Sequence, residues 1–251
     1  MDPIIELKDK VILVTGATGG LGENICMALA AQGATPVIHY HSNDAKAAEL
    51  LQKIMDCGID TLCIKADIRV EEEVQSMIKQ IKAKFGKIDC LVNNAGILSR
   101  GFLAMQSLEN YKEVVDINLF GNFLVLKHVS QLMINQRSGT IVNMSSAAGM
   151  GGLKGQSVYS STKGALNAIT IVLAKEMADF NVRVNAVAPG FIASGMLERP
   201  TRNDEKHKEA IPMKRFGKAS EVSSVVLFLL SDAASYMTGQ ILVIDGGLLI
   251  A

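Results

Sequence analysis

The stretch "VILVTGATGGLG", residues 11–22, decides the fold class. Its first part, "VILVT", is a nearly continuous apolar and β-branched run, which is typical of a strand buried on both faces of a sheet. Glycines follow at positions 16, 20 and 22, and we expect a helix to begin at about Glu23. Glycine lets the backbone approach a pyrophosphate closely, and the free N–H groups at a helix start favour its charge. A glycine-rich turn alone indicates only a tight connection, but its place between strand and helix indicates a dinucleotide site.

The alternation of strand and helix continues along the chain. Amphipathic helical patterns, for instance Glu71–Phe85 and Tyr111–Ile134, separate short runs rich in β-branched residues. Repeated β-α-β order predicts an α/β fold with a doubly wound, Rossmann-type, mostly parallel seven-stranded sheet and helices on both faces. Ligands should bind beyond the carboxyl ends of the strands. After the first strand, the predicted strands are 35–40, 61–66, 88–93, 140–145, 182–188 and 241–245.

The 251 residues are predicted to form one dinucleotide-binding and catalytic domain, because no linker, repeat or low-complexity tract divides them. One long polar stretch, 193–219, interrupts the rhythm, and we predict that it is a mobile substrate lid. Apolar residues stand among its charges, which suits a flexible acyl or ring-shaped substrate, although these residues could equally belong to the core. They are Met196, Leu197, Ile211 and Met213.

Charge and composition argue against several classes of protein. Lys+Arg and Asp+Glu both number 25, so the chain lacks the basic surface that nucleic acids or anionic membranes select. The first residues, "MDPIIELKDK", have acids where a signal peptide is basic, and no apolar run approaches the roughly 20 residues of a membrane span. We therefore expect a cytoplasmic protein. Cys26, Cys57, Cys63 and Cys90 lack metal-ligand spacing and are expected to be small buried residues, so no metal site is predicted.

A set of ordered motifs resembles the short-chain dehydrogenase/reductase family from about Lys8 to Gly247. The glycine spacing is G-x-x-x-G-x-G rather than G-x-G-x-x-G. The other motifs are "NNAG" (93–96), Asn118 in "DINLFG", Ser146 in "NMSSAAG", Tyr159-x-x-x-Lys163 and "PGF" (189–191). Within this family, the length and the segments "VNAVAPGFI", "PMKRFGKASEV" and "MTGQILVIDGG" are most similar to 3-oxoacyl-[acyl-carrier-protein] reductases. Many alcohol, sugar and polyketide reductases share these segments.

The resemblance implies a catalytic set of Asn118, Ser146, Tyr159 and Lys163. Tyr159 would donate a proton to a ketone oxygen, and Lys163, on the same helical face, would lower its pKa by about 1 to 3 and bind the nicotinamide ribose. Ser146 would donate to the substrate carbonyl, whereas Ser145 is predicted to make local backbone hydrogen bonds. Asn118 would hold a backbone kink and a water that relays protons to Lys163. Without this context, the Tyr159 and Lys163 pair would be a surface pair and Asn118 a solvated helix residue.

The resemblance also implies a cofactor site. Asp67 would contact the adenine, and it could also be the N-cap of the helix that begins at Glu71. Asn94, Ala95 and Gly96 would line the ribose. Residues 189–192 would bound the nicotinamide, with the Ile192 backbone at the carboxamide, and Ser194 stands where many relatives carry Thr. The full expected set is Gly16, Thr18, Gly19, Gly20, Leu21, Gly22, His41, Ser42, Asp67, Ile68, Asn94, Ala95, Gly96, Tyr159, Lys163, Pro189, Gly190 and Ile192.

The residues that follow the second strand favour NADP(H), with NAD(H) possible. An acid at that strand end usually holds the ribose 2′-OH of NAD. In "IHYHSNDAK" (38–46) neither Tyr40 nor His41 is a carboxylate, and Asp44 fits better as an N-cap of the next helix. NADP-using relatives often carry Arg where Gly19 stands. The side chains left to meet a phosphate are His41, Ser42 and Asn43.

We therefore predict NADP-dependent reduction of a 3-oxoacyl thioester bound to an acyl carrier protein. A polyketide ketoreductase or a secondary-alcohol dehydrogenase of the same family is the alternative. A non-catalytic dinucleotide-binding protein is a third hypothesis, but it would not need all four catalytic residues.

Partner contacts are expected from the same resemblance. The carrier protein is acidic, and Arg137 matches one basic docking position, whereas Phe180 occupies the second. Relatives are usually homotetramers whose Tyr-bearing helices and C-terminal strands pack across two-fold axes. Ala165 and Ala168 in the Tyr159 helix permit such close approach. Other basic residues that could replace the second docking position are Lys154, Lys214 and Arg215.

Overall fold

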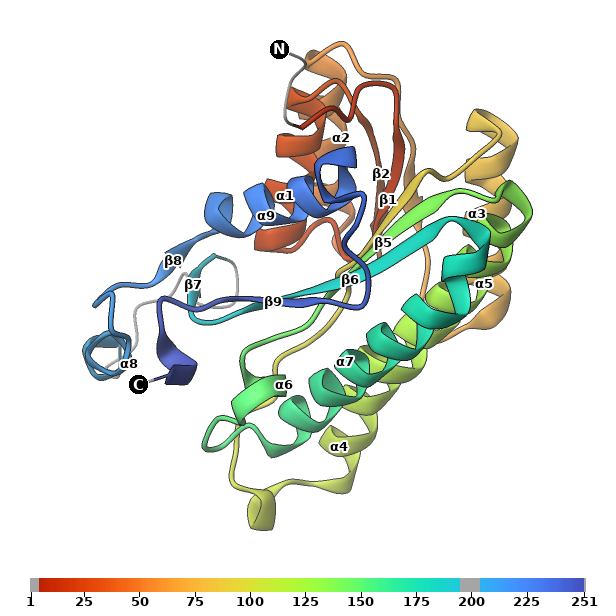
Figure 1. Ribbon diagram of the computed structural model, residues 1–251. Helices are drawn as coiled ribbons and strands as arrows, with labels where there is room; N and C mark the ends of the chain where they lie inside the picture. The colour runs from red at the N-terminus through yellow and green to blue at the C-terminus, as the bar shows by residue number, and fades with distance from the viewer. Residues whose placement is uncertain (1–4, 195–203, 251) are drawn as a thin grey trace.

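The computed structural model describes residues 5–194 and 204–250, and its centre is a parallel sheet of seven strands (Figure 1). The order across the sheet is β3-β2-β1-β4-β5-β6-β9. The predicted fold class is confirmed, and each predicted strand is present within about two residues of its expected ends. The strands are β1 (Val11–Val14), β2 (Thr35–Tyr40), β3 (Cys63–Lys65), β4 (Cys90–Asn93), β5 (Gly139–Met144), β6 (Val182–Pro189) and β9 (Ile241–Ile244).

Helices cover both faces of the sheet because the strand residues are apolar on both sides. Ile12 and Val14 of β1 face one apolar cluster, and Val11 and Leu13 face the other. Figure 1 shows α1 and α9 side by side on the first face. That face carries α1 (Gly20–Ala31), α2 (Asp44–Asp56) and α9 (Ala219–Leu230). The second carries α3 (Glu71–Phe85), α4 (Leu108–Val115), α5 (Asn122–Gln136) and α7 (Ser157–Met177).

The strand order creates a crevice at the centre of the sheet. From β1 the chain proceeds outward through β2 to β3, and then returns across the sheet to β4 on the other side of β1. Val14 at the end of β1 therefore lies between Ile38 of β2 and Val92 of β4. The connections after β1 and β4 leave in opposite directions, which opens the space beyond their carboxyl ends.

Three predictions about helix ends are wrong. The helix after the glycine loop begins at Gly20 instead of Glu23, because only Gly19 is extended. Asp44 is the first residue of α2 and does not cap it; the side chain of Asn43 accepts the hydrogen bond from the Lys46 N–H at 3.0 Å. Asp67 does not cap α3 either, because Val70 occupies the N-cap.

The predicted helix Tyr111–Ile134 is three segments. A π-helical turn, η2 (Asp116–Gly121), separates α4 from α5. The apolar pattern continues through the turn, so periodicity did not reveal it. Among the described residues, short 3₁₀ turns lie at Leu103–Met105, Ala178–Phe180, Asp232–Ala234 and Leu248–Ile250.

In the predicted lid, 193–219, the described residues are 193–194 and 204–219, and they are more regular than expected. It contains α8 (Asp204–Ala210), and β7 (Ile192–Ala193) pairs in parallel with β8 (Gly217–Lys218). Ile211 is buried, and Met213 is exposed. Met196 and Leu197 lie outside the described residues.

Cysteine burial is mixed, and no described helix could cross a bilayer. Cys26 and Cys90 are buried as expected, but Cys57 is exposed at the end of α2 and Cys63 is only partly buried. Within residues 5–194 and 204–250, every helix is too short or too polar to span a membrane.

Candidate active site

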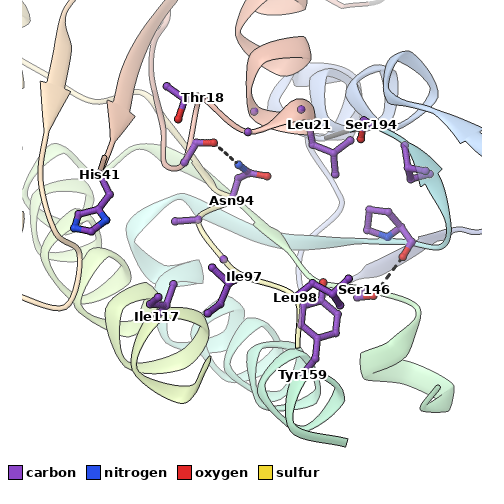
Figure 2. A pocket seen from close by; sticks show the side chains of 18 of the residues that line it. Thr18, Leu21, His41, Asn94, Ile97, Leu98, Ile117, Ser146, Tyr159 and Ser194 are labelled. Atoms are coloured by element: carbon purple, nitrogen blue, oxygen red, sulfur yellow. Dashed lines mark hydrogen bonds between the residues drawn. The ribbon is translucent and has the colours of Figure 1, made fainter. Parts of the chain in front are cut away.

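A cleft of about 640 Å³ lies beyond the carboxyl ends of the central strands (Figure 2). Every residue predicted to bind the cofactor lines it except Lys163, and Ser146 lines it as well. Asn118 and Lys163 lie behind its wall, where their polar atoms approach Gly96. The sequence analysis missed several lining residues, which include His39, Lys46, Arg69, Arg100, Gln156 and Phe191.

The glycine loop provides a site for a pyrophosphate. Gly16 has φ +62°, and a Cβ there would lie 2.9 Å from the Cα of Ala95, so only glycine fits between the loop and β4. A Cβ on Gly22 would overlap the carbonyl oxygen of Gly16. No side chain caps the start of α1, so its first N–H groups are available to an anion. These features fit the phosphates of a dinucleotide.

Thr15 and Asn94 join the ends of β1 and β4. The Thr15 hydroxyl accepts hydrogen bonds from the N–H groups of Asn94 at 2.9 Å and Ala95 at 3.0 Å. In return, the Asn94 amide donates to the carbonyls of Thr15 and Gly16. The sequence analysis did not single out Thr15. Its position directly before the glycine loop is the sequence feature that could have indicated a role at the cleft. The two residues hold the floor of the cleft at the point where the strands diverge.

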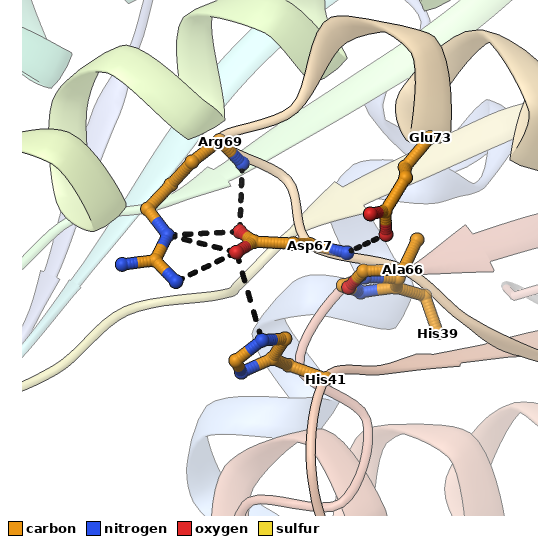
Figure 3. A network of polar contacts seen from close by, with 6 residues as sticks. All are labelled: His39, His41, Ala66, Asp67, Arg69 and Glu73. Atoms are coloured by element: carbon orange, nitrogen blue, oxygen red, sulfur yellow. Dashed lines mark hydrogen bonds and ion pairs between the residues drawn. The ribbon is translucent and has the colours of Figure 1, made fainter.

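Asp67 sits at the end of β3 with its charge already paired (Figure 3). Its carboxylate accepts hydrogen bonds from the Arg69 guanidinium at 2.6 to 3.0 Å, and these hydrogen bonds lower the pKa of Asp67. His41 Nε2 lies 3.6 Å from the same carboxylate, and its side chain is 60% exposed. Asp67 therefore faces the cleft as half of an ion pair.

His39 is buried beneath the glycine loop, and burial lowers its pKa from 6.5 to about 4. The folded state therefore keeps His39 neutral, whereas the unfolded chain protonates it as the pH falls below about 6.5. The stability from the neutral ring is present above pH 6.5 and is lost as the pH falls through 4. The expected loss is about 3 kcal/mol.

Urea unfolding of the wild type and a His39→Asn variant at several pH values measures this effect. The difference between their unfolding free energies should shrink as the pH falls from 6.5 to 4, because only the wild type carries the histidine penalty. A constant difference over this range would contradict the assignment. A His128→Asn variant is the control, because His128 pairs with Glu71 outside the cleft.

Tyr159 and Lys163 come from one face of α7, and they are not a surface pair. Lys163 is 4% exposed, and its ammonium donates to the Met144 carbonyl at 2.7 Å. Burial lowers the pKa of Lys163 to about 8. The Tyr159 phenol points into the cleft (Figure 2), and burial raises its pKa while a hydrogen bond with Ser146 opposes this shift.

The expected lowering of the Tyr159 pKa by Lys163 is therefore not the dominant effect, because burial raises this pKa. The ammonium lies 5.8 Å from the centroid of the Tyr159 ring and is directed at the strand carbonyl instead. Tyr159 is consequently a protonated phenol at neutral pH, able to donate a proton.

Ser146 lies two residues after the end of β5 and lines the cleft. Its hydroxyl accepts a hydrogen bond from the Ala148 N–H at 3.2 Å, at the start of α6 (Ala148–Gly151), and is 3.5 Å from the Pro189 carbonyl. Ser145 was predicted to make local backbone hydrogen bonds, which is wrong. Its buried hydroxyl donates to the Asn167 side chain and the Lys163 carbonyl, both on α7. Ser145 therefore fixes α7 to the sheet, and Ser146 is the hydroxyl that faces the cleft.

Asn118 lies in the π-helical turn, where the backbone departs from an α-helix as expected for a kink. Its amide oxygen accepts the Ile97 N–H and its amide nitrogen donates to the Ile97 carbonyl, both at 2.8 Å. The side-chain amide of Asn122 donates to the backbone carbonyls of Ile117 and Asn118. It thereby provides hydrogen-bond donors to carbonyl groups within the π-helical turn. Asn118 thus holds the chain after Gly96 against α7.

Gly149 was also missed by the sequence analysis. A Cβ there would lie 2.7 Å from the backbone carbon of Lys163, so α6 packs directly on the backbone of α7. Any larger residue would displace the helix that carries both Tyr159 and Lys163.

Arg137 and Phe180, the predicted docking positions, lie at the other end of the sheet from the cleft. Arg137 precedes β5, and its guanidinium is 6.0 Å from the Phe180 ring. Of the possible substitutes, Arg215 is ion-paired with Glu221, and the Lys214 ammonium donates to the Glu209 carbonyl. Lys154 does not line the cleft itself, but it follows Leu153, which does.

Comparison with known proteins identifies the family. Residues 16–249 match the family model described as Enoyl-(Acyl carrier protein) reductase. A 3-oxoacyl-[acyl-carrier-protein] reductase of Synechocystis sp. is 42% identical over 243 residues, which are 96% of this chain and 98% of that protein. The crystal structure of a short-chain type dehydrogenase/reductase from Mycobacterium marinum superposes with a TM-score of 0.93 at 32% identity, covering 98% of both chains. The chain belongs to the short-chain dehydrogenase/reductase family.

Membership makes this short-chain reductase an NAD(P)-dependent oxidoreductase, and its glycine loop and cleft fit a nicotinamide dinucleotide. Levodione reductase has a TM-score of 0.94 at 33% identity, covering 98% of this chain and all of that one. The backbone of this chain is therefore closely similar to that of levodione reductase.

Proposed function

We propose that this short-chain reductase uses NADPH to reduce the ketone of a 3-oxoacyl thioester, carried by acyl carrier protein, to the 3-hydroxyacyl product. The observation that carries the proposal is the convergence of the Tyr159 and Ser146 hydroxyls in the cleft (Figure 2). The Lys163 ammonium lies behind the cleft wall, near Gly96. Two O–H donors at one point suit an oxygen that gains negative charge. The entire chain is proposed to act as one domain, with 193–219 as the substrate lid.

The bound nicotinamide would supply a hydride to the ketone carbon. The carbonyl oxygen would then gain the electron pair of the C=O π bond, and Tyr159 would donate its phenolic proton to that oxygen. Ser146 donates a hydrogen bond that orients the oxygen, and the buried Lys163 ammonium stabilises the phenolate that remains. Asn118 is proposed to hold the Gly96–Ile97 segment and to complete a proton path from solvent to Lys163.

Preference for NADPH is supported by the charges at the end of β2. The sequence analysis left out one cation: Lys46, in the first turn of α2, lines the cleft together with His41 and Ser42. Asp44, the carboxylate beside them in sequence, is engaged by Tyr40 and Lys65. An anionic 2′-phosphate would thus meet the Lys46 ammonium and the Ser42 hydroxyl rather than a free carboxylate.

A His41→Asp variant is expected to shift the preference towards NADH. The new carboxylate would repel the 2′-phosphate and could accept a hydrogen bond from a 2′-OH. The ratio of kcat/KM for NADPH to that for NADH should fall by about tenfold or more, which corresponds to about 1.4 kcal/mol. His41→Asn, which adds no charge, is the matched control. An unchanged ratio in the Asp variant would contradict the proposed phosphate position.

The names of the relatives favour a thioester, but they differ in the bond reduced. The Synechocystis protein is named for a 3-oxoacyl substrate, whereas the family model is described by an enoyl reductase. Hydroxyl donors directed at a carbonyl oxygen favour ketone reduction. A polyketide ketoreductase or a secondary-alcohol dehydrogenase remains the alternative, because Phe180 replaces a basic docking residue and levodione reductase shares the backbone.

Initial rates of NADPH and NADH oxidation test these functions together. The substrates are acetoacetyl and crotonyl thioesters, each on coenzyme A and on acyl carrier protein, and a simple cyclic ketone. The proposal expects NADPH oxidation to be fastest with the carrier-bound acetoacetyl group. Turnover of only the cyclic ketone would favour the alternative, and turnover of only crotonyl thioesters would indicate an enoyl reductase. No turnover with any substrate would favour a non-catalytic dinucleotide-binding protein.

A homotetramer is proposed from exposed apolar side chains on α7 and β9. Ile171 and Val172 of α7 and Val243 of β9 are exposed, and Ala165 and Ala168 leave room on α7 for a second helix. Sedimentation velocity measures the assembly, and a monomer at micromolar concentration would contradict the proposal.

A further inference from the structure

We propose that His39 is a positioning residue of the cofactor site, whose ring sets the spacing between the two walls of its adenosine half. His39 lies in β2, is 2% exposed and lines the cleft. The sequence analysis assigned it no role. The inference uses the nicotinamide dinucleotide of the family and does not depend on the choice between NADP and NAD.

The first wall is the glycine loop, which His39 holds through two successive amides. The Gly16 N–H donates to His39 Nδ1 at 3.1 Å, and the Ala17 N–H donates to the His39 carbonyl at 2.9 Å. Both bonds orient the loop at the residue with the positive φ, where the backbone turns towards the phosphates. The side chain of His39 therefore acts on the position of the loop.

The second wall is the chain that leaves β3. His39 Nε2 donates to the Ala66 carbonyl at 3.0 Å, and the next residue, Asp67, faces the cleft (Figure 3). The Asp67 N–H is held in turn by the Glu73 carboxylate at 2.6 Å. A single imidazole thus spans from Gly16 to Ala66, and the cleft between these walls is where an adenosine would lie.

Only a neutral imidazole satisfies both contacts. Gly16 supplies a donor and Ala66 an acceptor, so Nδ1 must be unprotonated and Nε2 protonated. Around the ring, His41, Asp67 and Arg69 are the charged or titratable groups, and Arg69 pairs with Asp67. Asparagine has a shorter side chain and reaches one partner at most, whereas leucine reaches neither and leaves the Gly16 amide without an acceptor.

Binding of the cofactor and its fragments to His39→Asn and His39→Leu tests the proposal. The dissociation constants of NADPH and NADH are measured by fluorescence, and those of 2′,5′-ADP and reduced nicotinamide mononucleotide by calorimetry, at a temperature where all variants are folded. We expect both dinucleotides and 2′,5′-ADP to bind about tenfold more weakly in His39→Leu, with a smaller loss in His39→Asn. Nicotinamide mononucleotide should bind within twofold of wild type, and kcat at saturating cofactor should change less than threefold.

His128→Asn is the matched control, since it removes a partly buried histidine on α5 outside the cleft, and it should change none of these constants. Equal losses for 2′,5′-ADP and nicotinamide mononucleotide would mean that His39 only stabilises the fold and would overturn the proposal. Unchanged dinucleotide affinity in both His39 variants would overturn it as well. A loss seen with both NADPH and NADH would support it even if the NADPH preference proposed above were wrong.

Discussion

A Tyr159→Phe variant should lose about 10²–10⁴-fold in kcat while it binds cofactor with an affinity within about twofold of wild type. The change removes only the phenolic oxygen, which is the group proposed to protonate the ketone oxygen. Burial raises the pKa of Tyr159, so the wild-type phenol is protonated at pH 7, and phenylalanine has no proton to donate. The ring itself keeps its volume against the cleft wall, so the fold should not change.

Steady-state turnover of the best thioester or ketone, together with the cofactor dissociation constant, measures this prediction. Tyr236→Phe is the matched control because Tyr236 is fully exposed, and it should keep wild-type kcat. If the Tyr159→Phe variant kept a tenth or more of the wild-type kcat, another group would have to be the acid. Ser146 would then be the first candidate, since its hydroxyl is the second donor at that point of the cleft.

A Lys163→Met variant should be almost inactive and more stable than the wild type. The wild-type ammonium is buried against the Met144 carbonyl and lies behind Gly96, where it would contact the ribose and the Tyr159 phenolate. Without this charge the developing phenolate has no cation, and kcat should fall by about 10²-fold or more. Methionine has a similar length, so the helix packing of α7 can be kept.

The gain in stability follows from the lowered pKa. Burial lowers the pKa of Lys163 from 10.5 to about 8, so a folded protein below pH 8 carries an ammonium that the unfolded chain solvates better. The penalty is about 3 kcal/mol, and the lost hydrogen bond to Met144 offsets about 1 kcal/mol of the gain. Lys163→Met should therefore raise the unfolding free energy by about 2 kcal/mol at pH 7.

The pH dependence of unfolding tests separately whether the Lys163 ammonium destabilises the fold. Between pH 8 and 10.5 the folded wild type has released this proton and the unfolded chain has not, so the penalty disappears as the pH rises. The stability advantage of Lys163→Met should shrink over that range. Denaturant unfolding at pH 7 and pH 9.5 measures it. If Lys163→Met were less stable than wild type at pH 7, the ammonium would have to stabilise the fold and not destabilise it.

The pattern of apolar residues was sufficient for the sheet. The strands are buried on both faces, so their composition alone separates them from the amphipathic helices. The glycine spacing after the first strand was sufficient to locate the glycine loop that lines the cleft. Cap positions were predicted less well. Asn43, not Asp44, caps α2, and Asp67 is held by Arg69, because local sequence cannot say which of several polar side chains reaches an amide.

Some residues of the candidate site could likewise be identified from the sequence, and others could not. Tyr159, Lys163, Ser146 and the glycine loop could be named as candidates from their order along the chain, because each belongs to a short motif. The roles of His39, Ser145 and Gly149 could not, since each depends on a contact with a distant segment: Gly16 and Ala66 for His39, and α7 for the other two.

Local composition was thus enough for the sheet, and the ordered motifs were enough for the family and for naming the candidate reacting groups. The protonation states and the width of the cleft arise from long-range packing. Burial beneath the loop keeps His39 neutral, burial against β5 lowers the pKa of Lys163, and burial in the cleft wall raises that of Tyr159. Desolvation depends on which elements enclose a group, and that enclosure exists only when segments far apart in the chain have packed together.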